Sequence, residues 1–354
     1  MTNLEKYRSI LSHEVQGLFL TSRYSRMYGA EFDIAEGYAI VSKNGARYYT
    51  DSRYIESAQN NIHGFEVIEF NASNPLSQLL NNAIAEFEIT ALGFEDSYLT
   101  VAELRNFESK LNATFVPYQA QINSFRGQKE PWELERMRKA QDITDKAFSE
   151  VCPRIKVGMT EKELAAELIY CLYKNGAEGL SFDPIVVAGP NTSMPHGVPG
   201  DRPIAEGDFI TMDFGVIFGG YCSDMTRTVA IGYATEEMKA IYNTVLQAQL
   251  AGIKATKAGA TGKDVDAAAR KVIAEAGYGE YFGHGYGHSL GLEIHEAPNC
   301  NARNTEPLPI GAVCSAEPGI YLPGKFGVRI EDVVIVTEDG CKNITHSPKE
   351  LLIL

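Results

Sequence analysis

The chain has 354 residues, 44% hydrophobic and 22% charged, which is the composition of a globular protein with two domains rather than one. The formal net charge of -14 argues against nucleic acid and anionic membrane as partners, because both are bound by clustered lysine and arginine. The N-terminal residues do not form a secretory signal, and no stretch has the apolar length of a membrane span. Six cysteines without a CxxC pair indicate reduced, mostly buried thiols, so we expect a cytoplasmic protein.

Residues 1–125 are predicted to form a small α/β domain, because apolar strand-like runs alternate with helical stretches. The runs read VQGLFLT, GYAIVSKNGARYYT, FEVIEF and ITALGFE. The second contains Asn44-Gly45 between two strand-like halves, which is a strong hairpin signal. A polar segment at 123–129 precedes Glu130-Pro131, where a long helical pattern opens, so we place the domain boundary there.

Residues 131–354 are predicted to form an α+β domain, with helices and antiparallel hairpins in separate blocks. Apolar residues recur at helical intervals from Pro131 to about Pro153. Thr160 and Glu163 form a capping box that opens a second helix, which ends near Gly176. Two further helices are predicted near 235–257 and 261–276, and glycine-punctuated strands lie between and after the helices.

Two aspartates share one face of a predicted hairpin at 208–232, DFITMDFGVIFGGYCSDMTRTVAIG. A two-residue turn at Gly219-Gly220 places Asp213 opposite Thr226, with Asp224 two residues further along the same face. Such diagonal neighbours are about 7 to 8 Å apart. A single aspartate in a strand is often only a turn or edge residue. Two on one face of an apolar hairpin repel each other and indicate a bound cation.

Two glutamates belong to a second predicted hairpin at 312–336, AVCSAEPGIYLPGKFGVRIEDVVIV. If its turn is centred on Gly324, Glu317 and Glu331 face each other, and Arg329 points the same way as Glu331. An ordinary solvated cross-strand arrangement is the plain alternative. The flanking residues are apolar, however, and buried charges need a partner, so a cation again explains the pattern.

Three histidines, His284, His288 and His295, fall within twelve residues in the glycine-rich segment FGHGYGHSLGLEIHE. One histidine alone is more often a core or surface residue than a ligand, but three together indicate a site. The segment contains no HExxH helix, no phosphate-binding GxxxxGK[ST] loop and no GxSxG elbow.

Four carboxylates and one imidazole therefore form the candidate metal-ligand set, namely Asp213, Asp224, His288, Glu317 and Glu331. Mostly hard oxygen ligands favour Mn²⁺, with Co²⁺, Zn²⁺ or Fe²⁺ as alternatives. Two such ions about 3.5 to 4 Å apart would activate a water molecule for hydrolysis.

The ordered segments IVVAGPNTSMPHG, MDFG, CSDMTRT, HGYGHSLGLEIHE, SAEPGIY and VRIED resemble the M24 metallopeptidases of the aminopeptidase P and Xaa-Pro dipeptidase (prolidase) group. The resemblance covers most of 131–354 and implies a "pita-bread" catalytic domain. The segment at 20–54 resembles the creatinase-like N-terminal domain of the same group. We therefore expect a metal-dependent exopeptidase, commonly a homodimer, that acts on small peptides with proline in second position.

The resemblance also implies a role for each residue. Asp224 and Glu331 would bridge two metals, Asp213 would complete the shell of one, and His288 and Glu317 that of the other. Glu317 would act as general base as well. His295 and His196 would hydrogen-bond the scissile peptide and stabilise the developing oxyanion. His284 would line the pocket for the proline side of the substrate, and Arg329 would brace the carboxylates.

Alternatives within and outside this class remain open. A general or methionine-type aminopeptidase is disfavoured by the N-terminal domain, His284 and Arg329. A non-catalytic peptide-binding module of the same fold is disfavoured because all five ligand positions are kept. Ser289 departs from the glycine that commonly follows the ligand histidine, and it is expected to adjust the shape of the pocket. Dipeptidase and aminopeptidase are not distinguished.

Overall fold

The computed structural model describes residues 1–354, and their contacts divide the chain into two compact units, Met1–Phe125 and Arg126–Leu354. All six cysteines are free and all but Cys341 are buried, which confirms the prediction of unpaired thiols. None of the helices combines the length and the apolar character that a membrane span requires.

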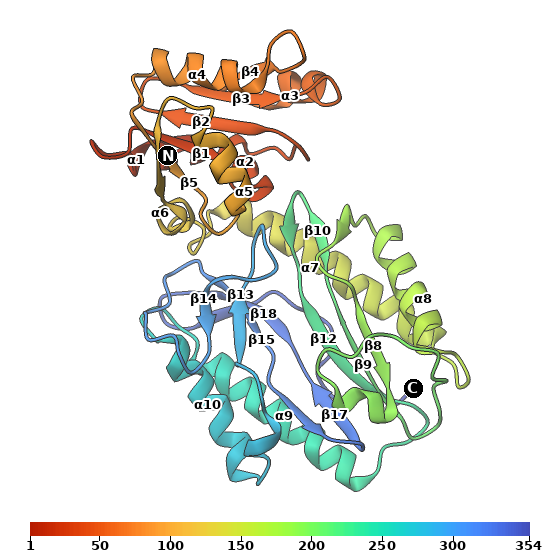
Figure 1. The fold of residues 1–354 in the computed structure, drawn as a ribbon. Helices are drawn as coiled ribbons and strands as arrows, with labels where there is room; N and C mark the ends of the chain where they lie inside the picture. The colour runs from red at the N-terminus through yellow and green to blue at the C-terminus, as the bar shows by residue number, and fades with distance from the viewer. The chain divides into compact units, whose positions relative to one another are not determined.

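The N-terminal unit is a mixed six-stranded sheet with strand order β4-β3-β2-β1-β5-β6, flanked by short helices (Figure 1). β1 pairs antiparallel with β2 and parallel with β5, so the unit is α/β as predicted. Its strands are β1 (Gly17–Leu20), β2 (Tyr38–Ser42), β3 (Ala46–Thr50), β4 (Glu66–Glu69), β5 (Ala91–Phe94) and β6 (Thr114–Pro117). Its helices are α1 (Asn3–Ser9), α2 (Arg23–Ala30), α3 (Ile55–Asn61), α4 (Leu76–Glu86), α5 (Val101–Glu108) and α6 (Gln119–Asn123).

The hairpin predicted at Asn44-Gly45 is present, but its turn lies one residue earlier. Ser42 pairs with Gly45 through a backbone hydrogen bond of 2.8 Å, so Lys43 and Asn44 form the loop. The Ser42 hydroxyl accepts hydrogen bonds from the backbone N–H groups of Asn44 and Gly45. A Cβ at Gly45 would lie 2.4 Å from the ring of Phe87, so the glycine is needed for packing rather than for the turn.

The C-terminal unit has two helix pairs, each associated with antiparallel strands. Its helices are α7 (Pro131–Val151), α8 (Glu161–Lys174), α9 (Glu236–Ala255) and α10 (Gly262–Glu275), with 3-10 turns η1 (Cys152–Arg154), η2 (Gly189–Ser193) and η3 (Gly279–Tyr281). Its strands are β7 (Gly179–Leu180), β8 (Ile185–Ala188), β9 (Phe209–Phe214), β10 (Val216–Phe218), β11 (Tyr221–Cys222), β12 (Met225–Ala230), β13 (Gly287–Ser289), β14 (Glu296–Cys300), β15 (Val313–Ala316), β16 (Gly319–Leu322), β17 (Phe326–Arg329), β18 (Asp332–Val336) and β19 (Cys341–Asn343). The predicted helices are confirmed, including the capping box of Thr160 and Glu163.

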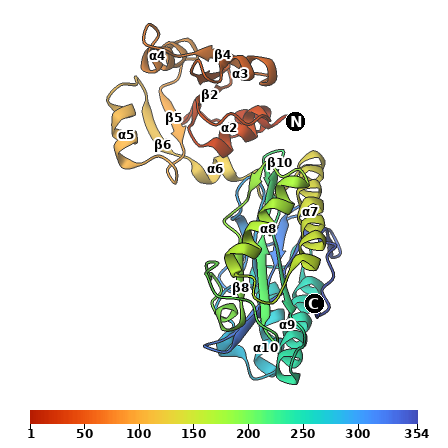
Figure 2. The ribbon, with the colours of Figure 1, turned by 90° about the vertical axis from the view of Figure 1, so that its right-hand side faces the viewer.

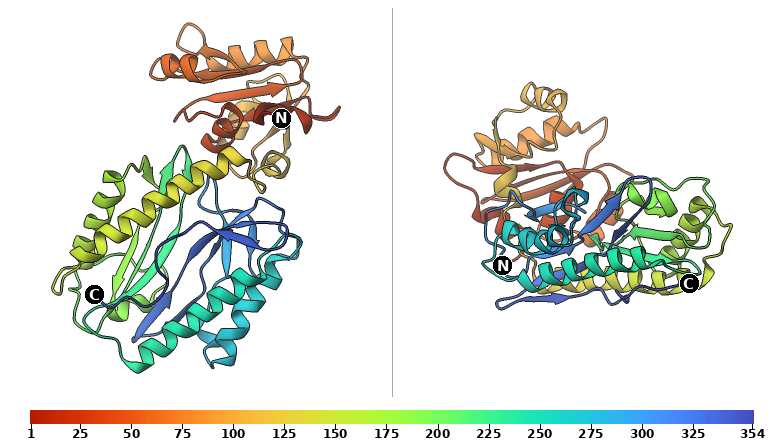
Figure 3. Two further views of the ribbon diagram at one scale, coloured as in Figure 1. Left: turned by 180° about the vertical axis from the view of Figure 1, so that it is seen from behind. Right: turned by 90° about the horizontal axis from the view of Figure 1, so that it is seen from below.

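α7 and α8 cover one half of the strands of this unit and α9 and α10 the other half (Figure 1), and Figure 2 shows α7 and α9 toward the same side of the unit. The view from behind shows α7 (yellow) and α9 (teal) both in front of the strands (Figure 3). One sheet has the order β12-β9-β8 and another the order β14-β13-β15-β18-β19, so antiparallel hairpins and helices form separate blocks. The α+β prediction for this domain is confirmed.

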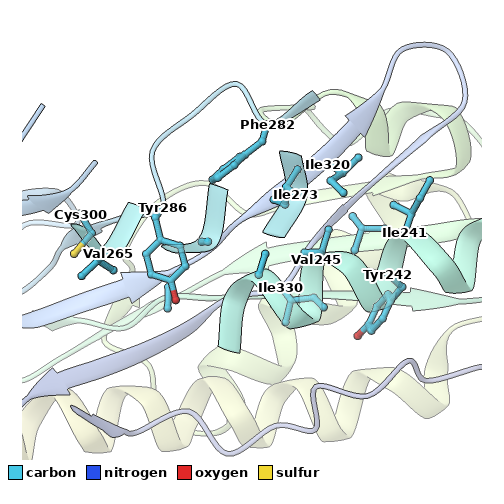
Figure 4. Close-up of a cluster of buried hydrophobic side chains, with 14 of the residues drawn as sticks. Ile241, Tyr242, Val245, Val265, Ile273, Phe282, Tyr286, Cys300, Ile320 and Ile330 are labelled. Carbon is cyan, nitrogen blue, oxygen red and sulfur yellow. The ribbon is translucent and has the colours of Figure 1, made fainter. Parts of the chain in front are cut away.

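Each helix pair covers its own apolar core. Side chains of α9 and α10, among them Ile241, Val245, Val265 and Ile273, pack against strand residues such as Ile320 of β16 (Figure 4). α7 and α8 enclose a second core with residues of β8, β9 and β12. Because close-packed cores deform little, the loops and strand ends between them are held in fixed positions.

The first predicted hairpin has the expected register. Asp213 pairs with Thr226, and the glycines of the turn, Gly219 and Gly220, have φ values of 55° and 78°, which a two-residue hairpin turn requires. The ladder breaks at Gly215, where a Cβ would lie 1.9 Å from the carbonyl oxygen of Ser223. Asp224 lies at this break, between β11 and β12.

The second predicted hairpin is also confirmed, and it is centred on Gly324, whose φ is 72°. Gly319 pairs with Arg329, and Ala316 pairs with Asp332 in the same register. The ladder is interrupted between these pairs. The backbone N–H of Glu317 donates to Tyr286 and that of Glu331 to Thr226, so both glutamates lie at a break as Asp224 does.

Candidate functional site

A cavity of about 380 Å³ in the C-terminal unit is lined by every side chain that the sequence singled out for metal binding or catalysis. These residues come from several strand ends and loops that are distant along the chain. They are His196, Asp213, Asp224, His284, His288, His295, Glu317, Arg329 and Glu331, together with Phe182, Ile185, Pro195, Gly285, Gly287, Ile294 and Asn301.

Asp213 and Arg329 form a buried ion pair at one wall of the cavity. Asp213 is 9% exposed on β9, and its Oδ2 atom accepts a hydrogen bond of 2.6 Å from Nη2 of Arg329. The Nε atom of Arg329 donates to Oγ1 of Thr226 at 3.0 Å. That hydroxyl donates in turn to Oε2 of Glu331 at 2.7 Å. Arg329 therefore orients two of the candidate ligands, one directly and one through Thr226.

Three buried carboxylate oxygens in this cavity have no hydrogen-bond partner: Oδ1 of Asp213, Oδ1 of Asp224 and Oε1 of Glu331. Burial, and next the charge of Asp213, raises the pKa of Asp224 well above its ordinary value. Burial, and next the charge of Asp224, raises the pKa of Glu331 in the same way. Repulsion between these carboxylates is therefore only partly relieved by the protein's own cations.

His288 presents one defined nitrogen to the carboxylates. Its Nδ1 atom lies 3.1 Å from the carbonyl oxygen of Ser289, which can only accept, so Nδ1 carries a proton. Nε2 lies 3.2 Å from Oε1 of Glu317 and 3.6 Å from Oδ2 of Asp224. Burial lowers the pKa of His288, but Glu317 and Asp224 outweigh it and raise the pKa to about 9. The carboxylates thus favour positive charge at Nε2.

The arrangement suits divalent cations. One ligand atom from each of Asp224, His288 and Glu331 lies within 4.8 Å of the others. Glu317 lies beside this group because it contacts His288. Asp213 contacts Arg329 in the lining of the same cavity. A cation between these groups would take up the unpartnered oxygens, and a backbone carbonyl that fixes the tautomer of a ligand histidine is a usual companion of metal ligands. The residues present therefore fit a metal centre.

Glycine allows His288 to reach this position. A Cβ at Gly287 would lie 2.1 Å from the carbonyl oxygen of Ser315, so β13 and β15 could not approach with any larger residue there. The Ser315 hydroxyl donates to Oε1 of Glu317 at 2.9 Å and accepts from the backbone N–H of His288 at 3.0 Å. Gly287 of the histidine segment therefore serves a close approach of strands.

His284 belongs to a hydrogen-bonded chain at the rim. Its Nδ1 atom donates to the carbonyl oxygen of Gly285, so Nε2 accepts from the Tyr321 hydroxyl at 2.9 Å. That hydroxyl accepts from Nη1 of Arg329, also at 2.9 Å. Burial is the main cause that lowers the pKa of His284. The neutral ring is thus held in one orientation.

His295 and His196 line the cavity, and neither imidazole is hydrogen-bonded to the carboxylates. The ring of His295 lies edge-on to that of His288, with 4.4 Å between the ring centroids. Burial, and next the charge of His288, lowers the pKa of His295. His196 is exposed and lies on the loop after η2. Both imidazoles line the same cavity as the metal-ligand cluster.

Some residues of the site are not recognisable from the sequence. Hairpin register places Thr226 opposite Asp213 but indicates no role for it, and no pattern singles out Tyr321 or Ser315. The hydroxyl residues lie in the two hairpins that carry the carboxylates, and this shared location is the signal that could have found them. The expectation that Ser289 adjusts the shape of the pocket is wrong. Its side chain is buried, with 3.5 Å between its Oγ atom and Sγ of Cys314, and it does not line the cavity. Successive side chains of a strand point to opposite faces, so the side chain of Ser289 diverges from that of the preceding histidine.

Comparisons with known proteins agree with this geometry. Residues 135–338 match metallopeptidase family M24, and residues 4–128 match the creatinase/prolidase N-terminal domain. An Xaa-Pro dipeptidase of Pyrococcus furiosus is 38% identical over 317 residues, which are 89% of each chain. A solved structure of an Xaa-Pro dipeptidase from Bacillus anthracis has a TM-score of 0.96 at 41% identity, covering 99% of both chains. An X-Pro aminopeptidase from Thermotoga maritima has a TM-score of 0.92 at 36% identity, again over 99% of both.

The matches cover both units of the chain, and the cavity with its unpartnered carboxylates lies inside the segment matched by the catalytic domain. The fold is a creatinase-like N-terminal domain followed by a pita-bread catalytic domain. The chain belongs to metallopeptidase family M24 and is a metal-dependent peptidase.

Proposed function

We propose that the protein hydrolyses the bond between a first residue and a proline in second position, in dipeptides or short peptides. The observation that carries the proposal is the convergence of Asp213, Asp224, His288, Glu317 and Glu331 on one cavity, with three buried carboxylate oxygens left without partners. Relatives named Xaa-Pro dipeptidase and X-Pro aminopeptidase support the choice of substrate.

These five residues would hold two divalent ions, with Asp224 and Glu331 bridging them. Mn²⁺ is the first choice because four of the five ligands are carboxylates. When bound, the ions would lower the pKa of a water molecule and polarise the scissile carbonyl. Reduced cytoplasmic surroundings and a homodimer stay predictions, the first from the six free cysteines and the second from the family resemblance.

Glu317 would take a proton from the attacking water and pass it to the proline nitrogen as that nitrogen leaves. The water oxygen adds to the carbonyl carbon, the C–N bond breaks, and the first residue leaves as a free amino acid. His295 and His196 would donate hydrogen bonds to the oxygen that becomes negative. His284, held by Tyr321, would line the pocket for the proline ring.

The test is a metal analysis combined with an assay of Ala-Pro, Ala-Pro-Ala and Met-Ala-Ser in the presence of Mn²⁺. We expect stoichiometric divalent metal and hydrolysis of the proline peptides, both lost on chelation and restored by added metal. Preferential cleavage of Met-Ala-Ser would instead indicate a general or methionine-type aminopeptidase. A protein without bound metal that hydrolyses none of the three would be a peptide-binding module.

A further inference from the structure

The segment 189–200, which we call the His196 loop, carries Pro195 and His196 into the lining of the metal-site cavity. It begins with η2 directly after β8 and includes two strongly exposed apolar side chains, Met194 at 49% and Val198 at 83%. Segments with few buried apolar contacts open easily. The position of His196 therefore depends on the polar contacts that hold this loop.

One carboxylate binds both ends of the His196 loop. Glu161 is the first residue of α8, and its side chain is fully buried. Oε1 of Glu161 accepts hydrogen bonds from the backbone N–H of Ala188 at 2.7 Å and from Nδ2 of Asn191 at 2.9 Å. Oε2 accepts from the backbone N–H of Gly200 at 2.8 Å. The two oxygens thus join the residue before the loop, its first turn and its last residue.

Neither ion pairing nor helix capping explains why Glu161 is buried. Its three partners are N–H donors rather than a lysine, arginine or histidine side chain. The start of α8 is already capped by the reciprocal hydrogen bonds of Thr160 and Glu163. Because burying a carboxylate is costly, its burial needs compensation, and the hydrogen bonds to the His196 loop supply it.

The middle of the His196 loop contacts β17, the strand that ends at Arg329. The Thr192 hydroxyl accepts a hydrogen bond of 2.8 Å from the backbone N–H of Gly327. Nη1 of Arg329 donates to the carbonyl oxygen of Pro195, the residue before His196, at 3.3 Å. These contacts hold the loop against the metal-site cavity, and the buried carboxylate holds both of its ends.

Resting on the proposed function, we propose that Glu161 is a positioning residue that acts through His196. By holding the ends of the His196 loop, it keeps the imidazole of His196 where that group donates to the developing oxyanion. Glu161 lies outside the metal-site cavity and is hydrogen-bonded to none of the candidate metal ligands. It therefore contributes to kcat rather than to metal binding.

Glu161→Gln tests this role in the metal-loaded enzyme with Ala-Pro as substrate. The amide has nearly the same shape, but its NH2 group only donates and would face an N–H donor. We expect kcat to fall by about tenfold or more with KM and metal content unchanged, because a small displacement of a positioned group can cost about 100-fold. Glu163→Gln, an exposed change two residues along the same helix, is the matched control and should keep full activity. Unchanged kcat in Glu161→Gln would overturn the proposal.

A double-mutant cycle with His196→Ala separates positioning from general destabilisation. If Glu161 acts through His196, adding Glu161→Gln to His196→Ala should cost no further activity, within about twofold. Fold losses that multiply in the double variant would show an effect independent of His196 and would equally overturn the proposal. A native protein that hydrolyses neither Ala-Pro nor Ala-Pro-Ala would overturn the proposed function instead.

Hydrogen exchange follows the loop without reference to turnover. In Glu161→Gln, the amides of 188–200 should exchange at least about tenfold faster than in the native protein, while those of β12 keep their rates. Asn191→Ala removes only one of the three donors, so it should act in the same direction by less and tests the same contact if Glu161→Gln does not fold. Unchanged exchange of the loop in these variants would contradict the hold that Glu161 has on it, whatever the substrate.

Discussion

Two buried acidic clusters lie near each other in the C-terminal unit, and they differ in how the negative charge of their carboxylates is compensated. Glu296 has a side chain only 4% exposed and contacts both Arg126 and Lys129, with 2.9 Å to Nζ of Lys129. Arg126 also pairs with Glu293, so two acids meet two bases in this cluster. Burial raises the pKa of Glu296, but Lys129 and Arg126 outweigh it and lower the pKa to about 2. Asp224 and Glu331 have raised pKa values and unpartnered oxygens instead.

The balance of charge in a buried cluster separates a structural role from a functional one. A cluster in which acids and bases match is neutral by itself and needs nothing further. A cluster with more acids than bases indicates a cation that the protein does not provide. His295 and Glu296 are adjacent in sequence, yet one lines the metal-site cavity and the other belongs to the neutral cluster. Adjacent residues can therefore serve different purposes.

The largest effect is expected from Asp224→Asn. Loss of the bridging ligand that we propose should reduce kcat/KM by more than about 100-fold, since even partners of metal ligands cost about 10- to 100-fold. In chelated protein the same change should raise Tm, because it removes one of the repelling charges. Steady-state kinetics, metal content and thermal denaturation measure the three quantities. Asp142→Asn, an exposed change on α7, is the control, and turnover retained by Asp224→Asn would contradict a ligand role.

Glu296→Gln tests the matched cluster. It leaves Lys129, whose side chain is 1% exposed, without its carboxylate partner, so we expect a loss of about 3 to 5 kcal/mol in the free energy of unfolding. Chemical denaturation gives this value. Glu66→Gln breaks a pair of which Glu66 is 61% exposed, and it should cost less than about 1 kcal/mol. Similar losses in both variants would remove the distinction between buried and exposed pairs.

His295→Ala should separate activity from stability. We expect kcat to fall by about 100-fold, as for loss of one donor to a developing oxyanion, with metal content and Tm unchanged. His346→Ala, at an exposed position outside the cavity, controls for loss of an imidazole. Loss of metal from the His295→Ala protein would show that this residue is a ligand after all.

A pH titration of stability should give the smallest effect. The pKa of Glu296 falls from an ordinary 4.5 to about 2 on folding, so its stabilisation is complete above pH 4.5 and is lost as pH falls toward 2. The difference in unfolding free energy between the native protein and Glu296→Gln should therefore shrink within this window. A difference that grows on acidification would have the wrong sign for an ionised Glu296.

Local signals in the sequence predict much of the fold. The capping box at Thr160 and the paired glycines at 219–220 depend on neighbouring residues only, and both predictions are confirmed. Hairpin register follows from turn position, because side chains alternate along a strand. The turn near Asn44 lies one residue earlier than predicted, and Gly45 instead packs against Phe87, which is more than forty residues away in the chain.

The order of residues along the chain was enough to identify the acids and histidines that could bind metal and the hairpins that carry them, because residue chemistry and local periodicity are visible in sequence. Packing in three dimensions brings the five side chains together, with Asp224, Glu317 and Glu331 at breaks in two ladders. It also orients Glu331 through Thr226 and Glu317 through Ser315, and it turns Ser289 away. Packing also places Arg329 in an ion pair with Asp213. The contacts Ser289–Cys314, Thr226–Glu331 and Asp213–Arg329 join residues 25, 105 and 116 positions apart, and no local pattern encodes them.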